Sequence, residues 1–365
     1  MKRVLHVVNH MGIGGIQAFI MNLYRNIDKN EIQFDFLLHQ EISESYIDEI
    51  QKLGGKVYYV PARNRGIRKN IDALNSFFKE HNEYSIIHMH ESSLSYVMPL
   101  IVAKKYGVGK RIIHSHSTKS GGSKINKVLH YVNKYRIKNI ATDYLACGEL
   151  AAKWFYGSTN VASQCVIIKN GIDLDKFEFN PTVRMEKRCE LGIQSDSFVV
   201  GHIGRFNDVK NHSFLIDVFC QLLKSKPNSF LCLAGDGSLK KAIEEKVERL
   251  GLSDNVLFLG NCRDVHRLLQ AFDVVVMPSF YEGFPVTAVE AEANGVPIVL
   301  SDTITKEVQY KQNVLYCSLS DPIDIWVQTI LSNQSRIIDN TTLRDNKLDI
   351  KNTVSELKNV YMSER

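Results

Sequence analysis

The chain of 365 residues is 44% hydrophobic and 23% charged and carries a formal net charge of +5. This composition is typical of folded globular proteins and excludes disordered and fibrous chains, while the length suggests about two domains. No apolar run approaches the roughly 18 residues that a membrane-spanning helix needs. The seven cysteines stand singly, mostly inside apolar runs, which is typical of a reducing compartment. With no signal-peptide pattern before the first apolar run, we expect a cytoplasmic protein.

Short, β-branched apolar runs alternate with amphipathic stretches along the whole chain. In the first half, strands are predicted at Val4–Val8, Gln33–Leu38, Lys56–Val60, Ile86–His90, Arg111–His114, Tyr144–Cys147 and Val166–Lys169. In the second half, strands are predicted at Phe198–Ile203, Phe230–Ala234, Val256–Leu259, Val274–Met277, Pro297–Leu300 and Val314–Cys317. The stretches between them include the predicted helices Gln17–Ile27, Ser93–Tyr106 and Lys124–Ile140. Apolar strands separated by helices indicate parallel sheets that are covered on both faces.

The predicted fold class is therefore α/β, with two doubly wound, Rossmann-like domains. Ligands of such sheets bind at the carboxyl ends of the strands, so we expect the two domains to face a central cleft. The charged, strand-poor stretch Asp173–Leu191 suggests a boundary, with residues 1–175 in the first domain and residues 176–350 in the second. Residues 351–365 are expected to form a C-terminal helix that packs back toward the first domain.

A glycine loop, Gly12-Ile13-Gly14-Gly15, follows the first predicted strand and precedes a helix. Glycines let a ligand approach the backbone, and a helix N-terminus offers N–H groups to an anion. The dinucleotide fingerprint fails, because Gln17 stands where a third glycine is required. The alternative is a tight turn that binds no ligand.

Two histidine pairs, His88 with His90 and His114 with His116, fall at the ends of predicted strands. Alternation along a strand points both members of a pair to one face. Four imidazoles could form a metal site, although only Glu91 stands beside them as an oxygen ligand. We favour one imidazole of the second pair acting on a substrate, with the others structural, and expect no metal.

A basic stretch runs from Lys104 to Lys138, with ten lysines and arginines and no acidic residue. Aromatic residues such as Tyr131 and Tyr135 are interleaved, and the nearby Trp154-Phe155-Tyr156 is expected to add an interfacial anchor. This combination favours an anionic membrane surface, with a solvated basic face as the alternative and no nucleic-acid module present. The residues expected in this membrane or acceptor patch are Lys119, Lys124, Lys127, Lys134, Arg136 and Lys138.

The second half carries the most informative residues. Arg205 and Lys210 follow a predicted strand, where a guanidinium fork and an ammonium can bind one diphosphate. Gly235 follows the next strand. Glu282 stands just before a predicted helix and Glu290 about two turns inside it, and carboxylates bind vicinal hydroxyls well.

Together these residues resemble the retaining glycosyltransferases of the GT4 family, which have the GT-B fold. The resemblance covers nearly the whole chain and extends to the EpsF-like subgroup that serves bacterial exopolysaccharide and capsule synthesis. The motifs that carry it are Gly14-Gly15, His114-Ser115-His116, Asn170-Gly171-Ile172-Asp173, Gly204-Arg205 with Lys210, Gly235-Asp236-Gly237 and Glu282 with Glu290. Gln17 departs from the family, where many members carry Glu.

The resemblance implies a nucleotide diphosphate-sugar donor, with UDP expected, held by the second domain without a metal or other cofactor. Arg205 and Lys210 would neutralise the diphosphate, Glu282 would bind the donor sugar and Glu290 the ribose. His116, rather than His114, would lie near the sugar. The backbone expected to line the donor belongs to Gly14, Gly15, Gly235, Gly283, Phe284, Pro285 and Val286.

The family also implies an acceptor, expected here to be a saccharide linked to polyprenyl diphosphate at the inner face of the cell membrane. Its members are thought to react on one face of the sugar, so no carboxylate nucleophile is expected. Three alternatives stay open: an NDP-sugar epimerase on the same fold, a non-catalytic partner subunit, and a metal-dependent hydrolase built on the histidines. The intact set of Arg205, Lys210, Glu282 and Glu290 argues against the second.

Overall fold

The computed structural model describes residues 1–365 except 44, 118–122, 158–160, 283, 333–334 and 364–365. The chain divides into two compact units, one made of Met1–Gly171 with Ile350–Arg365 and the other of Ile172–Asp349. The chain leaves the first unit after residue 171, whereas the predicted boundary follows residue 175. It returns to the first unit at Ile350, so the C-terminal segment belongs to this unit. None of the helices in the described ranges combines the length and apolarity needed to cross a bilayer.

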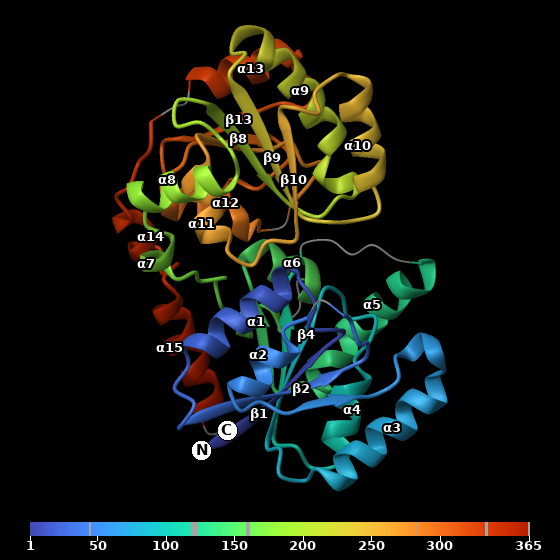
Figure 1. Cartoon of the computed structure of the whole chain (residues 1–365). Helices are drawn as coiled ribbons and strands as arrows, with labels where there is room; N and C mark the ends of the chain where they lie inside the picture. Colours follow the sequence, from blue (N-terminus) through green and yellow to red (C-terminus); the bar gives the residue numbers. More distant parts are fainter. Residues whose placement is uncertain (44, 118–122, 158–160, 283, 333–334, 364–365) are drawn as a thin grey trace. The chain divides into compact units, whose positions relative to one another are not determined.

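The first unit contains a parallel sheet in the order β3-β2-β1-β4-β5-β6-β7 (Figure 1). Its strands are β1 (Lys2–Val8), β2 (Ile32–Leu38), β3 (Val57–Tyr59), β4 (Ile86–Glu91), β5 (Lys110–Ser115), β6 (Asp143–Ala146) and β7 (Val166–Ile167). The order reverses between β1 and β4, so this is a doubly wound sheet with its switch point there. The register pairs His6 with His88 and His90 with His114.

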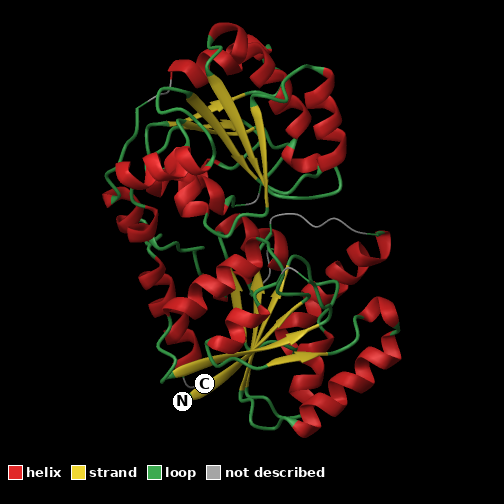
Figure 2. Cartoon of the chain, in the orientation of Figure 1, coloured by secondary structure: helices red, strands yellow, loops and turns green. Residues whose placement is uncertain are grey.

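Helices cover both faces of this sheet (Figure 2). They are α1 (Gly15–Asn26), α2 (Ile47–Lys52), α3 (Ile67–Glu80), α4 (Met98–Lys105), α5 (Lys124–Arg136), α6 (Glu149–Tyr156) and α15 (Ile350–Met362). The C-terminal helix α15 buries Ile350, Leu357 and Tyr361 and packs against α1. These three side chains of α15 lie with Phe19 of α1 and Phe34 of β2 in one of the unit's two core clusters.

The second unit repeats the plan with a parallel sheet in the order β10-β9-β8-β11-β12-β13. Its strands are β8 (Phe198–Ile203), β9 (Ser229–Ala234), β10 (Val256–Gly260), β11 (Val274–Met277), β12 (Ile298–Ser301) and β13 (Val314–Cys317). Its helices are α7 (Leu174–Phe177), α8 (Pro181–Glu190), α9 (His212–Ser225), α10 (Lys240–Arg249), α11 (Val265–Ala271), α12 (Val286–Asn294), α13 (Ile323–Ser332) and α14 (Thr341–Asp345). Here the strand order reverses between β8 and β11.

The α/β class with two doubly wound domains is thus confirmed. Each predicted strand has a counterpart in one of the two sheets, because continuous runs of valine, isoleucine and leucine suit strands that are buried on both faces. Whether the two sheets face one cleft stays a prediction.

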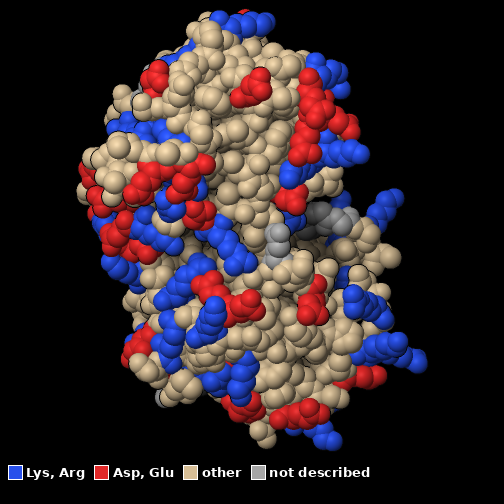
Figure 3. Space-filling model, viewed as in Figure 1, with Lys and Arg blue, Asp and Glu red and all other residues tan. Residues whose placement is uncertain are grey.

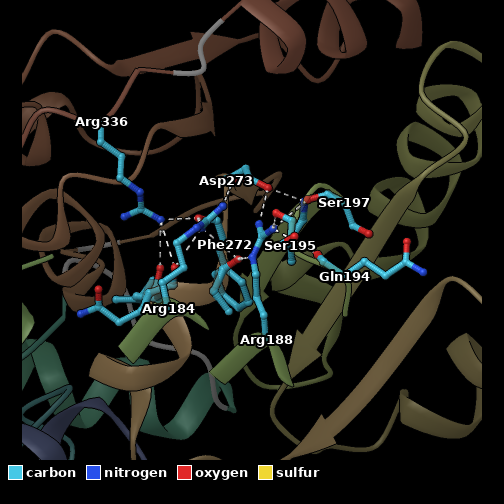
Figure 4. Close-up of polar contacts among 12 residues, drawn as sticks. Arg184, Arg188, Gln194, Ser195, Ser197, Phe272, Asp273 and Arg336 are labelled. Carbon is cyan, nitrogen blue, oxygen red and sulfur yellow. Dashed lines mark hydrogen bonds and ion pairs between the residues drawn. The ribbon is translucent and has the colours of Figure 1, made fainter. Parts of the chain in front are cut away.

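An arginine cluster fixes the amino-terminal edge of the second sheet (Figure 4). Arg184 and Arg188 of α8 bind the two carboxylate oxygens of Asp273 at 2.5 and 2.7 Å. The same carboxylate accepts the backbone N–H of Val199 at the start of β8. Together with Arg336, these arginines also donate to carbonyl oxygens of Leu269 to Phe272 at the end of α11. Cations at this position satisfy the free carbonyls of a helix C-terminus, so the cluster is structural.

Candidate active site

The switch point of the second sheet brings two loops together. One loop follows β8 and contains Arg205 and Lys210, and the other follows β11 and contains Glu282. They are joined directly, since the backbone N–H of Phe280 donates to the carbonyl of Val209 at 2.8 Å. Ligands of doubly wound sheets bind at this point, so the predicted residues stand where the fold favours binding.

Lys210 and Glu282 form an ion pair at this edge. The Lys210 Nζ lies 2.5 Å from Glu282 Oε1, and both side chains are largely shielded from solvent. The Ser279 hydroxyl donates to the same carboxylate oxygen at 2.9 Å. Ser301, the last residue of β12, and Thr303 just beyond it donate in turn to the Ser279 carbonyl. The pair is therefore held in place by hydrogen bonds from two neighbouring strands.

Two further charged groups of the site have no partner of their own. Arg205 is exposed, and its guanidinium forms no ion pair or hydrogen bond among the described residues, although its backbone carbonyl accepts from Asn207. The carboxylate of Glu290, on α12, likewise has no hydrogen-bond partner in the described part of the chain, and burial raises its pKa to about 7. A free guanidinium and a free carboxylate can bind a phosphate and hydroxyl groups without first breaking a bond inside the protein.

Steric crowding explains why a glycine, Gly235, follows β9. Gly235 has φ +138°, and a Cβ there would lie 2.1 Å from the carbonyl oxygen of Gly204. The two loops that follow β8 and β9 can therefore pack closely only because residue 235 has no side chain.

Helix α12 begins at Val286, and Pro285 stands at its N-cap with no side chain capping the first turn. Phe284 and Val286 are partly buried against the core of the second unit. The predicted contact residue Gly283 lies outside the described residues. The uncapped first turn leaves backbone N–H groups that could bind an anion.

The glycine loop of the first unit leads into α1. Gly14 is the N-cap in extended conformation, and a Cβ on Gly15 would meet no atom within 4 Å. Gln17 turns back and donates to the His10 carbonyl at 3.0 Å, so it stabilises the loop. The open space above Gly15 is compatible with a ligand against the backbone.

Five histidines, not four, gather on the face of the first sheet that α1 and α15 cover. His6 joins the four that the sequence singles out, and burial lowers the pKa of every member, to about 3 for His6 and His116. His114 is fully buried, whereas His116 is partly exposed just past the end of β5. Of the second pair, His116 is the imidazole that a ligand can reach.

The same histidines form the metal-ligand sets that the described residues offer. Ring nitrogens lie within 4.8 Å of one another in the group of His6, His88 and His90, and in the group of His90, His114 and His116. Neither group includes a carboxylate or a thiol.

The basic stretch corresponds mainly to α5. Lys124, Lys127, Arg136 and Lys138 are exposed, and Lys119 lies outside the described residues. Lys134 is partly buried and donates to the Trp154 carbonyl at 2.8 Å. Basic side chains and uncharged surface lie along the edge of the unit that contains α5 (Figure 3).

The apolar side chains between these charges face solvent. Ile125, Val128, Tyr131 and Tyr135 of α5 are each more than 60% exposed. The other predicted anchor, Trp154-Phe155-Tyr156, is wrong: Phe155 and Tyr156 are fully buried, because the spacing of Ala151, Ala152, Phe155 and Tyr156 places them on the core side of α6.

Three residues at these sites were not identified from the sequence. Ser279 could have been predicted from the sequence, because a hydroxyl three positions before Glu282 can donate to its carboxylate. His6 and Tyr361 gave none, because a lone histidine in a strand and a tyrosine in the last helix do not reveal that they meet His90 and His88.

Comparison with known proteins gives consistent results. Residues 183–314 match the family described as glycosyl transferases group 1. The chain is 38% identical to the putative glycosyltransferase EpsF of Bacillus subtilis (strain 168), over 99% of this chain and 96% of that protein. It is 27% identical to the Escherichia coli UDP-Gal:alpha-D-GlcNAc-diphosphoundecaprenol alpha-1,3-galactosyltransferase, over 82% of this chain and 79% of that one.

Solved structures share the fold. HepE of Anabaena, determined in complex with UDP and glucose, matches over all of both chains with a TM-score of 0.82 and 19% identity. Sucrose-phosphate synthase from Thermosynechococcus elongatus matches 99% of this chain and 98% of its own with a TM-score of 0.76 and 18% identity. At these identities the likeness establishes the fold, GT-B, and nothing further.

Proposed function

The chain belongs to the group 1 glycosyl transferases. From this premise we propose that it transfers a sugar from a nucleotide diphosphate-sugar to a lipid-linked or saccharide acceptor, with retention of anomeric configuration. The reaction would serve exopolysaccharide or capsule synthesis. The observation that carries the proposal is the Lys210–Glu282 pair at the switch point of the second sheet, with Arg205 on the same loop as Lys210. All three residues lie within the segment that matches the family.

Each charged residue has a distinct role in this proposal. Arg205 and Lys210 neutralise the diphosphate, whose charge grows as the bond to the sugar breaks. Glu282 accepts hydrogen bonds from hydroxyls of the sugar, and Glu290 accepts them from the ribose. The backbone from Gly283 to Val286 lines the sugar and the phosphates.

The first unit contributes three residues. Gly14 and Gly15 let its backbone approach the donor phosphate and the acceptor. His116 contacts the transferred sugar, and its partial exposure, against the complete burial of His114, supports that choice.

Uridine is the base we propose for the donor. HepE, which shares the fold, was determined in complex with UDP, and the E. coli relative is named as a transferase that uses UDP-Gal. That name also contains diphosphoundecaprenol, which supports a saccharide linked to polyprenyl diphosphate as the acceptor.

Transfer is proposed to need no metal, because Arg205 and Lys210 supply two cations for the leaving diphosphate. The departing phosphate oxygen helps to deprotonate the acceptor hydroxyl on the same face of the sugar. The bond from the anomeric carbon to the diphosphate breaks, the bond to the acceptor oxygen forms, and the proton passes to the phosphate. No carboxylate nucleophile takes part.

A lipid-linked acceptor requires access to a bilayer, and α5 fits an anionic membrane surface. Its exposed apolar residues Ile125, Val128 and Tyr135 are flanked by exposed lysines and arginines, the pattern of an interfacial helix. Each basic residue near such a surface contributes about 1 kcal/mol. We therefore propose peripheral association with the cytoplasmic face of the cell membrane.

The test is transfer from a panel of UDP-sugars to a polyprenyl-diphosphate monosaccharide in the presence of EDTA. The expected product keeps the anomeric configuration of the donor sugar, read from its NMR coupling constant. An inverted product would contradict the retaining mechanism. Failure to transfer from any nucleotide-sugar, with or without divalent metal, would contradict the proposed activity.

A further inference from the structure

The buried histidines of the first sheet form two separate chains of hydrogen bonds. In one chain, His6 Nδ1 lies 2.9 Å from His90 Nε2, and His90 Nδ1 lies 2.9 Å from His116 Nε2. In the other, Tyr361 Oη lies 2.7 Å from His88 Nδ1, and His88 Nε2 lies 3.2 Å from His114 Nδ1. Only the first chain ends on an imidazole that is partly exposed, His116.

The two hydrogen bonds that link His6, His90 and His116 must run in the same direction. Burial keeps these imidazoles neutral, since it lowers the pKa of His6, His90 and His116 well below the ordinary value. A neutral imidazole has one N–H donor and one acceptor nitrogen. If His6 donates to His90, then His90 must donate to His116, and reversing one bond reverses the other.

The inner end of the chain decides between the two directions. His6 Nε2 is buried and has no hydrogen-bond partner among the described residues. The ring instead lies against aromatic neighbours, with centroids 4.1 Å from Phe34 and 5.6 Å from Phe36. A buried N–H without an acceptor is rarer in proteins than an acceptor without a donor. His6 Nε2 is therefore the unprotonated nitrogen, and the proton of the His6 ring is on Nδ1.

We infer that His6 and His90 are positioning residues that fix His116 in its Nδ1–H tautomer, so that His116 presents a hydrogen-bond donor. Each of the three histidines then carries its proton on Nδ1. The side-chain hydrogen bond of His116 within the described residues uses Nε2, so the proton on Nδ1 can bind a substrate oxygen. That this oxygen belongs to the sugar rests on the proposed function. A donor of this kind orients a hydroxyl or phosphate oxygen and does not act as a general base at that atom.

A metal ion is the competing interpretation of the same cluster. Three neutral imidazoles can hold a zinc ion. Here, however, the nitrogens of His6, His90 and His116 that would serve as ligands face one another in pairs. The contacts of 2.9 Å also satisfy the nitrogens as hydrogen bonds. The hydrogen-bonded chain accounts for the cluster without an added charge.

The direct test is NMR of the full chain with ¹⁵N-labelled histidine, because the two ring nitrogens have different chemical shifts in each tautomer. Couplings between nitrogens across the hydrogen bonds connect His6 to His90 and His90 to His116. We expect Nδ1–H signals for all three. A His116 signal of the Nε2–H or cationic form would overturn the inference, as would zinc bound in stoichiometric amount to the purified chain.

Two matched variants extend the test. His90→Phe removes the donor to His116 Nε2, and the His116 signal should then leave the Nδ1–H form. His88→Phe alters an equally buried histidine of the same strand in the other chain, and His116 should keep its tautomer. An unchanged His116 signal in His90→Phe would overturn the inference.

Kinetics provide a readout that depends on the proposed function. His90→Phe should lower kcat/KM for transfer about tenfold, the effect of one hydrogen bond, and His90→Gln, which can still accept and donate, should recover most of it. Equal losses in both variants would contradict the positioning role. The NMR result decides the tautomer whether or not transfer is observed, so failure of the proposed activity and failure of this inference are distinguishable.

Discussion

The Lys210 ammonium lies 2.5 Å from the Glu282 carboxylate, although the two residues are 72 positions apart in the chain. They meet because β8 and β11 are neighbours at the switch point of the second sheet. An isolated exposed ion pair contributes little to stability, but this one is shielded and shares its carboxylate oxygen with Ser279. In the proposed function, this pair at the binding edge of a doubly wound sheet positions charge for a ligand.

Lys210→Ala and Glu282→Gln are each expected to lower kcat for sugar transfer by about 10²–10³, the effect of removing one group that stabilises developing charge. The fold should persist, as circular dichroism and thermal unfolding will report. Lys240→Ala is the matched control, because that lysine forms a loose, more exposed pair with Glu244 at 3.8 Å in the same unit. Turnover like that of the wild type in either site variant would refute the donor-site assignment.

Nucleotide binding should depend on pH through Glu290. Burial raises the pKa of this carboxyl to about 7, so it is mostly protonated at pH 6 and mostly ionised at pH 8. If the ribose binds the ionised form, binding lowers the pKa, and affinity for UDP should rise with pH and level off above about 7. Calorimetric titration between pH 6 and 8 measures the effect. In Glu290→Gln, only the pH dependence that comes from the nucleotide phosphates should remain.

Gly235→Ala should destabilise the second unit by about 2–3 kcal/mol, because the new Cβ would collide with the Gly204 carbonyl and the residue would be held at positive φ. Gly251→Ala separates the two causes. Gly251 also has positive φ, +68°, but a Cβ there meets nothing within 4 Å, so about 1 kcal/mol is expected. Equal losses for the two variants in urea unfolding would show that the close approach of the loops does not matter.

Membrane binding should depend on α5. Neutralising the exposed residues Lys124, Lys127, Arg136 and Lys138 together should weaken sedimentation with anionic vesicles, and added salt should weaken binding of the wild type. Lys134 is left intact in this variant because it bonds to the Trp154 carbonyl.

The control for this experiment replaces three exposed basic residues of the second unit, Lys224, Lys241 and Arg249. It removes a similar charge without touching α5. Binding that falls equally in both variants would reflect net charge alone, and binding unchanged by the α5 variant would contradict the membrane proposal.

Asp273→Asn should lower the free energy of unfolding by about 2–3 kcal/mol, because Arg184 and Arg188 lose their shared counter-charge in a partly buried site. Asp264→Asn breaks a more exposed pair with Lys187 and should cost less than about 1 kcal/mol. Denaturant unfolding compares the two. A loss in Asp273→Asn no larger than in the control would mean that the arginine cluster is held by the helix carbonyls rather than by the carboxylate.

Much of the fold could be predicted from the sequence because its strands are buried on both faces. Runs such as Val274–Met277 are apolar at every position, which distinguishes them from the amphipathic helices between them. The charged residues after β8 and β11 could be recognised by their position at strand ends. Their direct contact could not, since it depends on strand order, which no local pattern encodes.

The first unit illustrates where sequence reasoning ends. Alternation along β4 correctly placed His88 and His90 on one face, but His6 reaches them only because β1 and β4 are paired. The aromatic run at the end of α6 was misread because exposure was inferred from residue type rather than from helical spacing, which puts Phe155 and Tyr156 in the core. The roles assigned to the individual site residues stay predictions.

The measurement that tests the account most directly is thermal unfolding of the full chain with and without UDP, in EDTA. At 100 times its dissociation constant, UDP should stabilise the wild type by about 2.7 kcal/mol. Lys210→Ala should lose most of this stabilisation at the same concentration. No stabilisation by any nucleoside diphosphate, or stabilisation only after a divalent metal is added, would contradict a metal-independent donor site in the second unit.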